Sequence, residues 1–313
     1  MVDYPTSIPI SVIALEMCNR GCRHCGVDAK PSLENPQIRD LKEWLKRATF
    51  PQDPTDPVIV TYGEPFNYPD LAQLIEAVLT HIDGKPIRIV TSGIDFRKEP
   101  ENQAAQFLSQ LPAELKRRTR FALSLSPYPA IPEDALVDNF VRTIEFMRQF
   151  GFYSLTNLLD DSPLSQRIKK AIQDTFGTNM SLIGRLSLKP FGRAFRNGLA
   201  QTNGDTFHNG FKECTYSNSS LALFPDGSLG PGCCTYISPY ISIAHIEDGP
   251  FAVEQKTGEF REELRQSVRE HPERAFGRVC FECLRLASET GRLRHPERAL
   301  RNVPGAEEII RAA

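Results

Sequence analysis

Three cysteines within eight residues constrain this 313-residue chain more than any other feature of its sequence. Cys18, Cys22 and Cys25 follow a CxxxCxxC spacing, directly after the apolar run 8–15. A loop that follows a strand can wrap three thiolates around one four-iron cluster, which takes four ligands. The fourth iron then stays open to a ligand that is not protein. The spacing predicts a [4Fe–4S] cluster rather than a structural zinc, which needs a fourth ligand and usually two CxxC pairs.

A glycine-containing turn, Tyr62-Gly63-Glu64-Pro65, follows the next apolar strand. Gly63 allows the backbone to approach a ligand closely, and the Glu64 carboxylate can accept hydrogen bonds from an α-amino group. The cysteine triad and this turn together resemble the radical S-adenosylmethionine (SAM) enzymes. Their CxxxCxxC signature and GGEP motif match here, with Tyr62 in place of the first glycine. An aromatic residue usually precedes the last cysteine of the signature, where this chain has His24.

Composition argues against several classes of partner and location. The 37 basic and 39 acidic residues nearly cancel, so the charge gives no argument for nucleic acid or an anionic membrane. No apolar run approaches the roughly 18 residues that a membrane span needs, and the N-terminus does not resemble a signal peptide. Eight cysteines in two groups favour metal over disulfides and predict a cytoplasmic protein, because thiols stay reduced there.

From residue 8 to about 190, apolar β-type runs alternate with segments of helical period. The expected strands are 8–15, 57–62, 86–91, 120–126, 153–158 and 181–189. The expected helices are 38–49, 69–82, 101–118, 132–150 and 163–176. Six such units predict an α/β fold with a parallel sheet, in which ligands gather at the carboxyl ends of the strands.

The resemblance implies that this sheet is a partial (β/α)6 TIM-type barrel, and that polar residues at other strand ends contact SAM. Besides Tyr62, Gly63 and Glu64, the candidates for cofactor binding are Ser92, Ser124, Ser126, Asn157 and Arg193. Ser124 and Ser126 would bond the ribose hydroxyls, Ser92 lies where relatives often carry a TNG-like turn, and Arg193 would bind a carboxylate. The alternatives are ordinary ones, since Ser and Asn are common turn formers and arginines are usually solvated.

A second cysteine group lies beyond a linker near 197–209, so we expect a barrel domain at 1–197 and a second domain at 198–313. Its members are Cys214, Cys233, Cys234, Cys280 and Cys283. The resemblance implies a small auxiliary-cluster domain of the twitch or SPASM type, with a second [4Fe–4S] cluster. Its ligands would be Cys214, Cys233, Cys280 and Cys283, and a Cys₄ zinc site is the alternative. Five residues, not the usual four, separate Gly227 from Cys233, which leaves open whether Cys233 or Cys234 is the ligand.

The resemblance also implies a reaction. An electron from a flavodoxin or ferredoxin cleaves SAM to a 5′-deoxyadenosyl radical, which removes hydrogen from a C–H bond of a peptide or small-molecule natural-product precursor. Adjacent residues of an extended segment point to opposite sides, so Cys234 would face away from a cluster held by Cys233. The tandem cysteines resemble those of peptide epimerases, in which the second thiol donates hydrogen to a peptide radical. A buried, unreactive Cys234 is the alternative.

Two other functions fit the same residues. In the first, the auxiliary cluster accepts an electron, as in an aminocyclitol-dehydrogenase-like or cross-linking enzyme. In the second, the chain is a non-enzymatic iron–sulfur or zinc scaffold. The Gly63-Glu64-Pro65 turn argues against a scaffold, because a scaffold has no need of a group that binds an amino acid.

Overall fold

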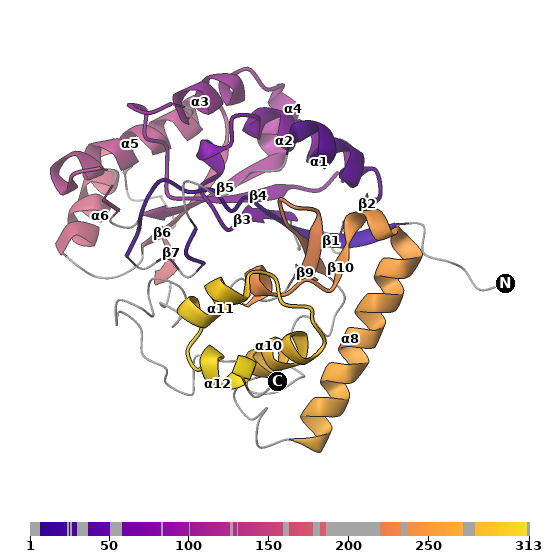
Figure 1. Cartoon of the computed structure of the whole chain (residues 1–313). Helices are drawn as coiled ribbons and strands as arrows, with labels where there is room; N and C mark the ends of the chain where they lie inside the picture. The colour runs from indigo at the N-terminus through magenta and orange to yellow at the C-terminus, as the bar shows by residue number, and fades with distance from the viewer. Residues whose placement is uncertain are drawn as a thin grey trace.

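A ten-stranded sheet organises the molecule (Figure 1), in the order β10-β9-β8-β1-β3-β4-β5-β6-β7, with β2 paired to β1. The structure is a computed structural model. It describes residues 7–23, 25, 27–29, 37–50, 58–82, 84–99, 101–125, 128–129, 131–158, 163–177, 182–185, 220–232, 237–271 and 279–311.

The strands expected from the sequence form the parallel part of this sheet. They are β1 (Ile8–Ala14), β3 (Val58–Thr61), β4 (Ile87–Thr91), β5 (Thr119–Leu125), β6 (Tyr153–Leu158) and β7 (Leu182–Arg185). Each strand pairs with the next in this series, and every pairing is parallel. The carboxyl ends therefore meet at one edge, and the α/β fold of a partial TIM-type barrel is confirmed.

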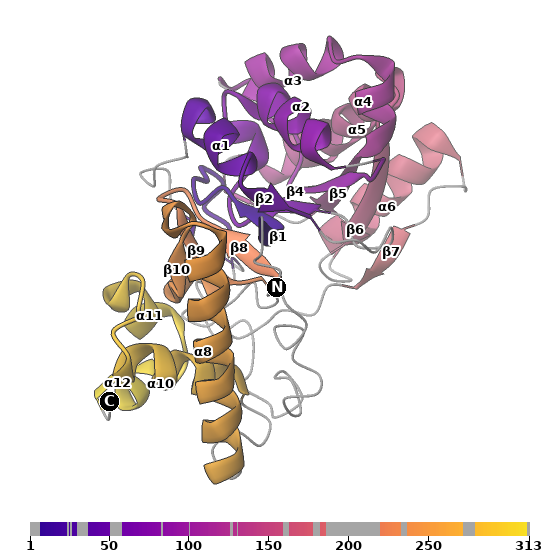
Figure 2. The same ribbon diagram turned by 90° about the vertical axis from the view of Figure 1, so that its right-hand side faces the viewer.

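The helices between these strands cover one face of the sheet (Figures 1 and 2). They are α1 (Ile38–Leu45), α2 (Leu71–His81), α3 (Glu101–Ser109), α4 (Ala113–Arg118), α5 (Glu133–Gln149) and α6 (Pro163–Phe176). In α5 the buried side chains include Leu136, Phe140, Ile144 and Met147, the apolar positions that predicted a helix covering a sheet.

Two predicted helices have different bounds. The helix expected over 101–118 is divided into α3 and α4, because Pro112 has no N–H to donate and lies in extended geometry just before α4. The helix expected over 38–49 ends at Leu45, and Ala48–Thr49 form the short strand β2, which pairs with β1 instead.

The main core lies between the sheet and these helices. Along β4 buried and half-buried residues alternate, as expected when one face of a strand meets the helices. Phe121 of β5 is fully buried there, stacked on Phe66 at 5.9 Å and edge-on to Phe152 at 5.3 Å between ring centroids. Aromatic contacts of this kind add to the burial of apolar area.

A hairpin around Gly227 extends this sheet. It consists of β8 (Leu221–Leu223) and β9 (Ser228–Pro231), and β10 (Ala244–His245) pairs with β9. Strand β8 also pairs in parallel with β1, so the hairpin continues the barrel sheet beside its first strand. The predicted domain boundary at residue 197 lies outside the described residues.

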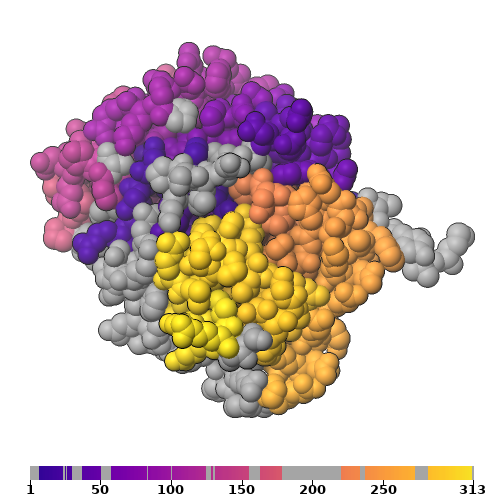
Figure 3. Space-filling model, viewed as in Figure 1, coloured from indigo at the N-terminus to yellow at the C-terminus, as the bar shows by residue number. Residues whose placement is uncertain are grey.

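The C-terminal helices lie on the other side of the sheet from α1–α6 (Figures 1 and 2). They are α8 (Pro250–Glu270), α10 (Val279–Glu289), α11 (Pro296–Asn302) and α12 (Ala306–Arg311). In the space-filling view they form one continuous surface with the hairpin (Figure 3). Among the described helices, none is both long and apolar enough to cross a membrane.

The position of Phe121 gives a test of the core. Replacing it with alanine removes a fully buried ring between two aromatic neighbours, so we expect Phe121→Ala to lower the free energy of unfolding by about 3–5 kcal/mol. Phe107→Ala is the matched control, because 48% of Phe107 is exposed, and its effect should stay within about 0.5 kcal/mol. Urea denaturation measures both, and equal effects would contradict this description of the core.

Candidate functional site

The cysteine loop begins at the carboxyl end of β1. Cys22 is buried, and Cys18 and Cys25 are partly exposed. The Arg20 N–H points to the Cys18 Sγ at 3.5 Å, and the Cys25 N–H donates to the Cys22 carbonyl at 3.3 Å. The three thiols therefore lie in one compact turn that is partly open to solvent, where a cluster and its small-molecule ligand could both reach them.

The electrostatics of this loop keep the free Cys18 thiol protonated. Burial, together with the charges of Glu64 and Cys25, raises the pKa of the Cys18 thiol to about 12, and the hydrogen bond from the Arg20 N–H opposes part of this rise. A thiol in this position ionises readily only when a metal supplies positive charge, because a bound metal replaces the proton.

The positions of the three cysteines bear on whether they could hold a single metal ion or a polynuclear cluster. Among the described residues, no three His, Cys, Asp or Glu side chains converge on one point where a single metal ion could bind. A cubane places each thiolate on a different iron, so its ligands need not converge in this way. The three cysteines can therefore hold a polynuclear cluster without converging on one point.

Gly63 brings the turn after β3 against the cysteine loop. A Cβ atom at this position would collide with the carbonyl oxygens of Leu15 and Met17, and would lie 2.8 Å from the Leu15 carbonyl carbon. The next residue, Glu64, donates its N–H to the Met17 carbonyl at 2.9 Å. Only glycine allows this approach, so the two predicted motifs share a backbone contact.

The Glu64 carboxylate is buried and bound by its own chain. It accepts hydrogen bonds from the Thr91 hydroxyl, from the Phe66 N–H at 3.2 Å, and from the Ser92 N–H at 2.9 Å and hydroxyl at 2.5 Å. The sequence led us to expect this carboxylate to meet an α-amino group. In the structure it fixes the turn after β4, and a contact with SAM stays a prediction.

Arg20, between the first two cysteines, is the largest fully buried side chain. Its guanidinium donates to both carboxylate oxygens of Glu101, at 3.1 and 2.7 Å, and to the Ser92 hydroxyl at 2.9 Å. It also bonds the Gly93 carbonyl and lies 4.6 Å from the centre of the Tyr128 ring. One buried cation thus joins the cysteine loop to β4 and α3.

Glu101, the first residue of α3, completes this network. Burial raises its pKa, and the charge of Arg20 opposes the rise. Its carboxylate also accepts from the Asn19 amide at 3.4 Å, the Asn67 amide at 3.2 Å and the Asp95 N–H at 2.6 Å. Neither Arg20 nor Glu101 was predicted from the sequence. The sequence signal that could have indicated this network was Arg20 itself, a charged residue between two of the predicted metal ligands.

The remaining predicted residues have different outcomes. Ser92 lies in the network described above, and Ser124 is the register partner of Asn157 near the carboxyl ends of β5 and β6. Cys283 is buried in α10, and Cys280 belongs to the same helix. Five predicted residues lie outside the described part of the chain, namely Ser126, Arg193, Cys214, Cys233 and Cys234.

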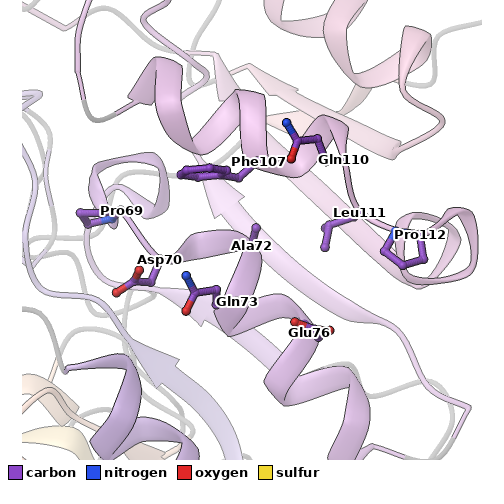
Figure 4. A pocket seen from close by; sticks show the side chains of 9 residues that line it. All are labelled: Pro69, Asp70, Ala72, Gln73, Glu76, Phe107, Gln110, Leu111 and Pro112. Carbon is purple, nitrogen blue, oxygen red and sulfur yellow. The ribbon is translucent and has the colours of Figure 1, made fainter.

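A pocket of about 250 Å³ lies elsewhere, between α2 and α3 on the helical face (Figure 4). Phe107, Leu111 and Pro112 line one side, and Asp70, Gln73 and Glu76 are among the residues on the other. None of its lining residues belongs to the cysteine loop or to the Gly63 turn, so the chemistry of the site does not involve it.

The part of the chain that carries both motifs is similar to a known family. Residues 12–124 match the family model described as Radical SAM superfamily. No curated protein matches the chain.

Two solved structures are similar to the chain. One is BtrN in complex with AdoMet and 2-DOIA, at 14% identity and a TM-score of 0.43, covering 81% of this chain and 86% of that one. The other is SuiB from Streptococcus suis bound to S-adenosylmethionine, at 11% identity and a TM-score of 0.32, covering 72% and 60%. At these values neither likeness carries an argument about function.

The backbone contact at Gly63 gives a test of the site. We expect Gly63→Ala to lower the free energy of unfolding by about 3 kcal/mol or more, the upper end for overpacking, because backbone cannot yield as a side chain does. The iron bound per chain after anaerobic reconstitution should fall with it. Gly258→Ala is the control, since nothing lies near its added Cβ and alanine favours helix α8 by up to about 1 kcal/mol. Wild-type stability in Gly63→Ala would contradict the contact.

Proposed function

Because residues 12–124 match the family model of the Radical SAM superfamily, we propose that this chain cleaves S-adenosylmethionine reductively and uses the product to abstract hydrogen from a substrate C–H bond. The observation that carries the proposal is the closure of the cysteine loop on the Gly63 turn, through the hydrogen bond from Glu64 to Met17. A scaffold protein has no use for a glycine turn held against its metal ligands. A SAM-binding enzyme needs the metal ligands and the glycine turn at the same edge of the sheet.

Cys18, Cys22 and Cys25 would hold the first [4Fe–4S] cluster and leave one iron free for the amino and carboxylate groups of SAM. When bound, the cluster supplies the electron that splits SAM into methionine and a 5′-deoxyadenosyl radical. The protein's own part is to bind, orient and exclude water. The electron would come from a flavodoxin or ferredoxin, in the cytoplasm.

The residues proposed to contact SAM are those at the carboxyl ends of the predicted strands. Gly63 leaves space beside the backbone, and Ser92 is fixed by Glu64 and Arg20. Ser124, at the end of β5, offers a hydroxyl to the ribose. Tyr62, Ser126, Asn157 and Arg193 complete the proposed contacts.

A second cluster would be held by Cys214, Cys233, Cys280 and Cys283. The support is the CxxC spacing, because Cys280 and Cys283 are three residues apart in α10. A Cys₄ zinc site shares this chemistry, and iron analysis of the protein separates the two.

We propose a peptide or natural-product precursor as the substrate, with Cys234 as the hydrogen donor. A hydrogen atom passes from the substrate α-carbon to the 5′-deoxyadenosyl radical, which becomes 5′-deoxyadenosine, and the Cys234 S–H then gives a hydrogen atom to the opposite face of the carbon radical. The resulting thiyl radical must take up one electron and one proton, and the flavodoxin or ferredoxin supplies the electron. The tandem Cys233-Cys234 supports this assignment.

SAM cleavage tests the first part of the proposal. Anaerobically reconstituted protein with dithionite should form 5′-deoxyadenosine, measured by chromatography with mass spectrometry. Cys22→Ser removes one of only three ligands, so we expect cleavage to fall by about 100-fold or more, comparable to losing an essential catalytic group. A protein that binds zinc but no iron, or a Cys22→Ser variant with full activity, would refute the proposal.

The fate of the substrate radical tests the second part. With a peptide that supports 5′-deoxyadenosine formation, reaction in D₂O should add one deuterium to the product, because the thiol proton exchanges with solvent. Cys234→Ser should stop this incorporation and leave SAM cleavage intact. A product that instead lacks two hydrogens would identify oxidation, with the second cluster as electron acceptor. Deuterium incorporation that persists in Cys234→Ser would exclude the thiol as donor.

A further inference from the structure

The C-terminal segment around α11 contacts the cysteine loop at both of its ends. Glu16 lies two residues before the first cysteine, and Val27 and Asp28 follow the last. Side chains of Arg294, Arg298 and Asn302 bind these flanking residues. These contacts join residues more than 270 positions apart in the chain.

The first flank is a buried ion cluster. The Glu16 carboxylate is only 4% exposed and accepts from Arg294 at 2.8 Å and from Arg298 at 3.2 Å, one arginine on each oxygen. Arg294 also pairs with Asp226 at 2.9 Å and stacks on the Phe224 ring at 4.4 Å. Removing one partner of such a cluster leaves the others charged in a buried site, which strongly opposes partial dissociation.

The second flank is held by hydrogen bonds. Arg298 donates to the Val27 carbonyl at 3.2 Å, and the Asn302 amide donates to the Asp28 carboxylate at 3.3 Å. Asp28 is buried and has a left-handed backbone with φ of 52°, which is uncommon for a residue other than glycine. This conformation needs support from its surroundings, and Asn302 supplies part of it.

Arg298 bridges both ends of the loop by itself. Its guanidinium is a rigid fork, so bonding Glu16 with one nitrogen and Val27 with another fixes the distance between the two flanks. The three cysteines lie between these points. Separation of α11 from the barrel would therefore release both ends of the cysteine loop together.

We propose that Arg298, supported by Arg294 and Asn302, is a positioning residue that sets the opening of the cysteine loop, so that docking of α11 and cluster binding stabilise each other. This inference has two halves. The cluster half, in which cluster binding and docking of α11 stabilise each other, rests on the proposed function. The loop half, in which Arg298 sets the opening of the cysteine loop, does not. Because coupling between two sites is reciprocal, a cluster at Cys18, Cys22 and Cys25 must strengthen the docking of α11.

The coupling also reaches the second cysteine group. Helix α12 packs against both α10 and α11, and α10 carries Cys280 and Cys283. Binding of metal to these cysteines would restrain α10 and, through α12, the helix that holds the first loop. The two cysteine groups are thereby linked through packed helices.

Hydrogen exchange on the metal-free full chain tests the loop half. We expect Arg298→Gln to speed exchange of residues 15–29 by at least about tenfold, and to leave β5 unchanged, because local opening has its own free energy. Arg301→Gln is the matched control, since Arg301 lies exposed on the same helix and donates to the Glu297 carbonyl of that helix at 3.2 Å. Arg298→Lys keeps the buried charge but lacks the fork, and should speed exchange of the loop without lowering the melting temperature.

Unchanged exchange of residues 15–29 in both Arg298 variants would overturn the inference. So would an equal rise throughout β4, β5 and β6, because that result indicates a general loss of stability rather than positioning of the loop.

Reconstitution with iron and sulfide tests the cluster half. Cluster assembly should slow exchange of α11 more in the wild type than in a Cys18→Ser/Cys22→Ser/Cys25→Ser variant, in which only the second cysteine group can still restrain α11, through α12. The same slowing in both proteins would overturn reciprocal coupling. If the wild type binds no cluster, the proposed function fails, whereas the exchange of the metal-free loop still decides the role of Arg298.

Discussion

The buried guanidinium of Arg20 is the interaction on which the arrangement of the site depends. It lies inside the cysteine loop and is paired with Glu101 of α3, while it also bonds the turn after β4. Breaking a buried pair of this kind by removing one partner typically costs about 3–5 kcal/mol. The cysteine loop therefore cannot take its conformation independently of β4 and α3, and the strand ends that form the site move as one unit.

Contacts from three directions complete this restraint. Gly63 brings the turn after β3 against Leu15 and Met17, Arg20 holds the loop from within, and α11 holds its two ends. Contacts with residues far away in the sequence therefore hold the loop in place, and contacts within the loop contribute less. The proposed cluster, which would accept an electron and position SAM, benefits from ligands that do not rearrange, since ordered surroundings replace solvent reorganisation.

The sequence predicted the elements of the fold well, because each strand and helix has a strong local period. Leu136, Phe140, Ile144 and Met147 mark one face of α5 by their spacing alone. The pairing of β8 with β1 has no such signal, because it joins segments about 200 residues apart and a local period does not show which strands pair. The Arg20–Glu101 pair, 81 residues apart, was missed for the same reason, and because charged side chains are rarely fully buried.

The Tyr62-Gly63 pair shows which part of the second motif is sterically required. Tyr62 stands where the resembling motif has glycine, and its φ of 76° carries a cost of about 1–2 kcal/mol for a residue with a Cβ. Its ring is buried and stacks on Phe224 at 5.8 Å, and burial of an aromatic ring offsets a strain of that size. No burial or stacking could offset a side chain at Gly63, because any Cβ there would collide with backbone carbonyl groups of the cysteine loop. The first glycine of the motif can thus be replaced by Tyr62, because the Phe224 ring stabilises that residue. The second glycine cannot be replaced, because two backbones are in contact there.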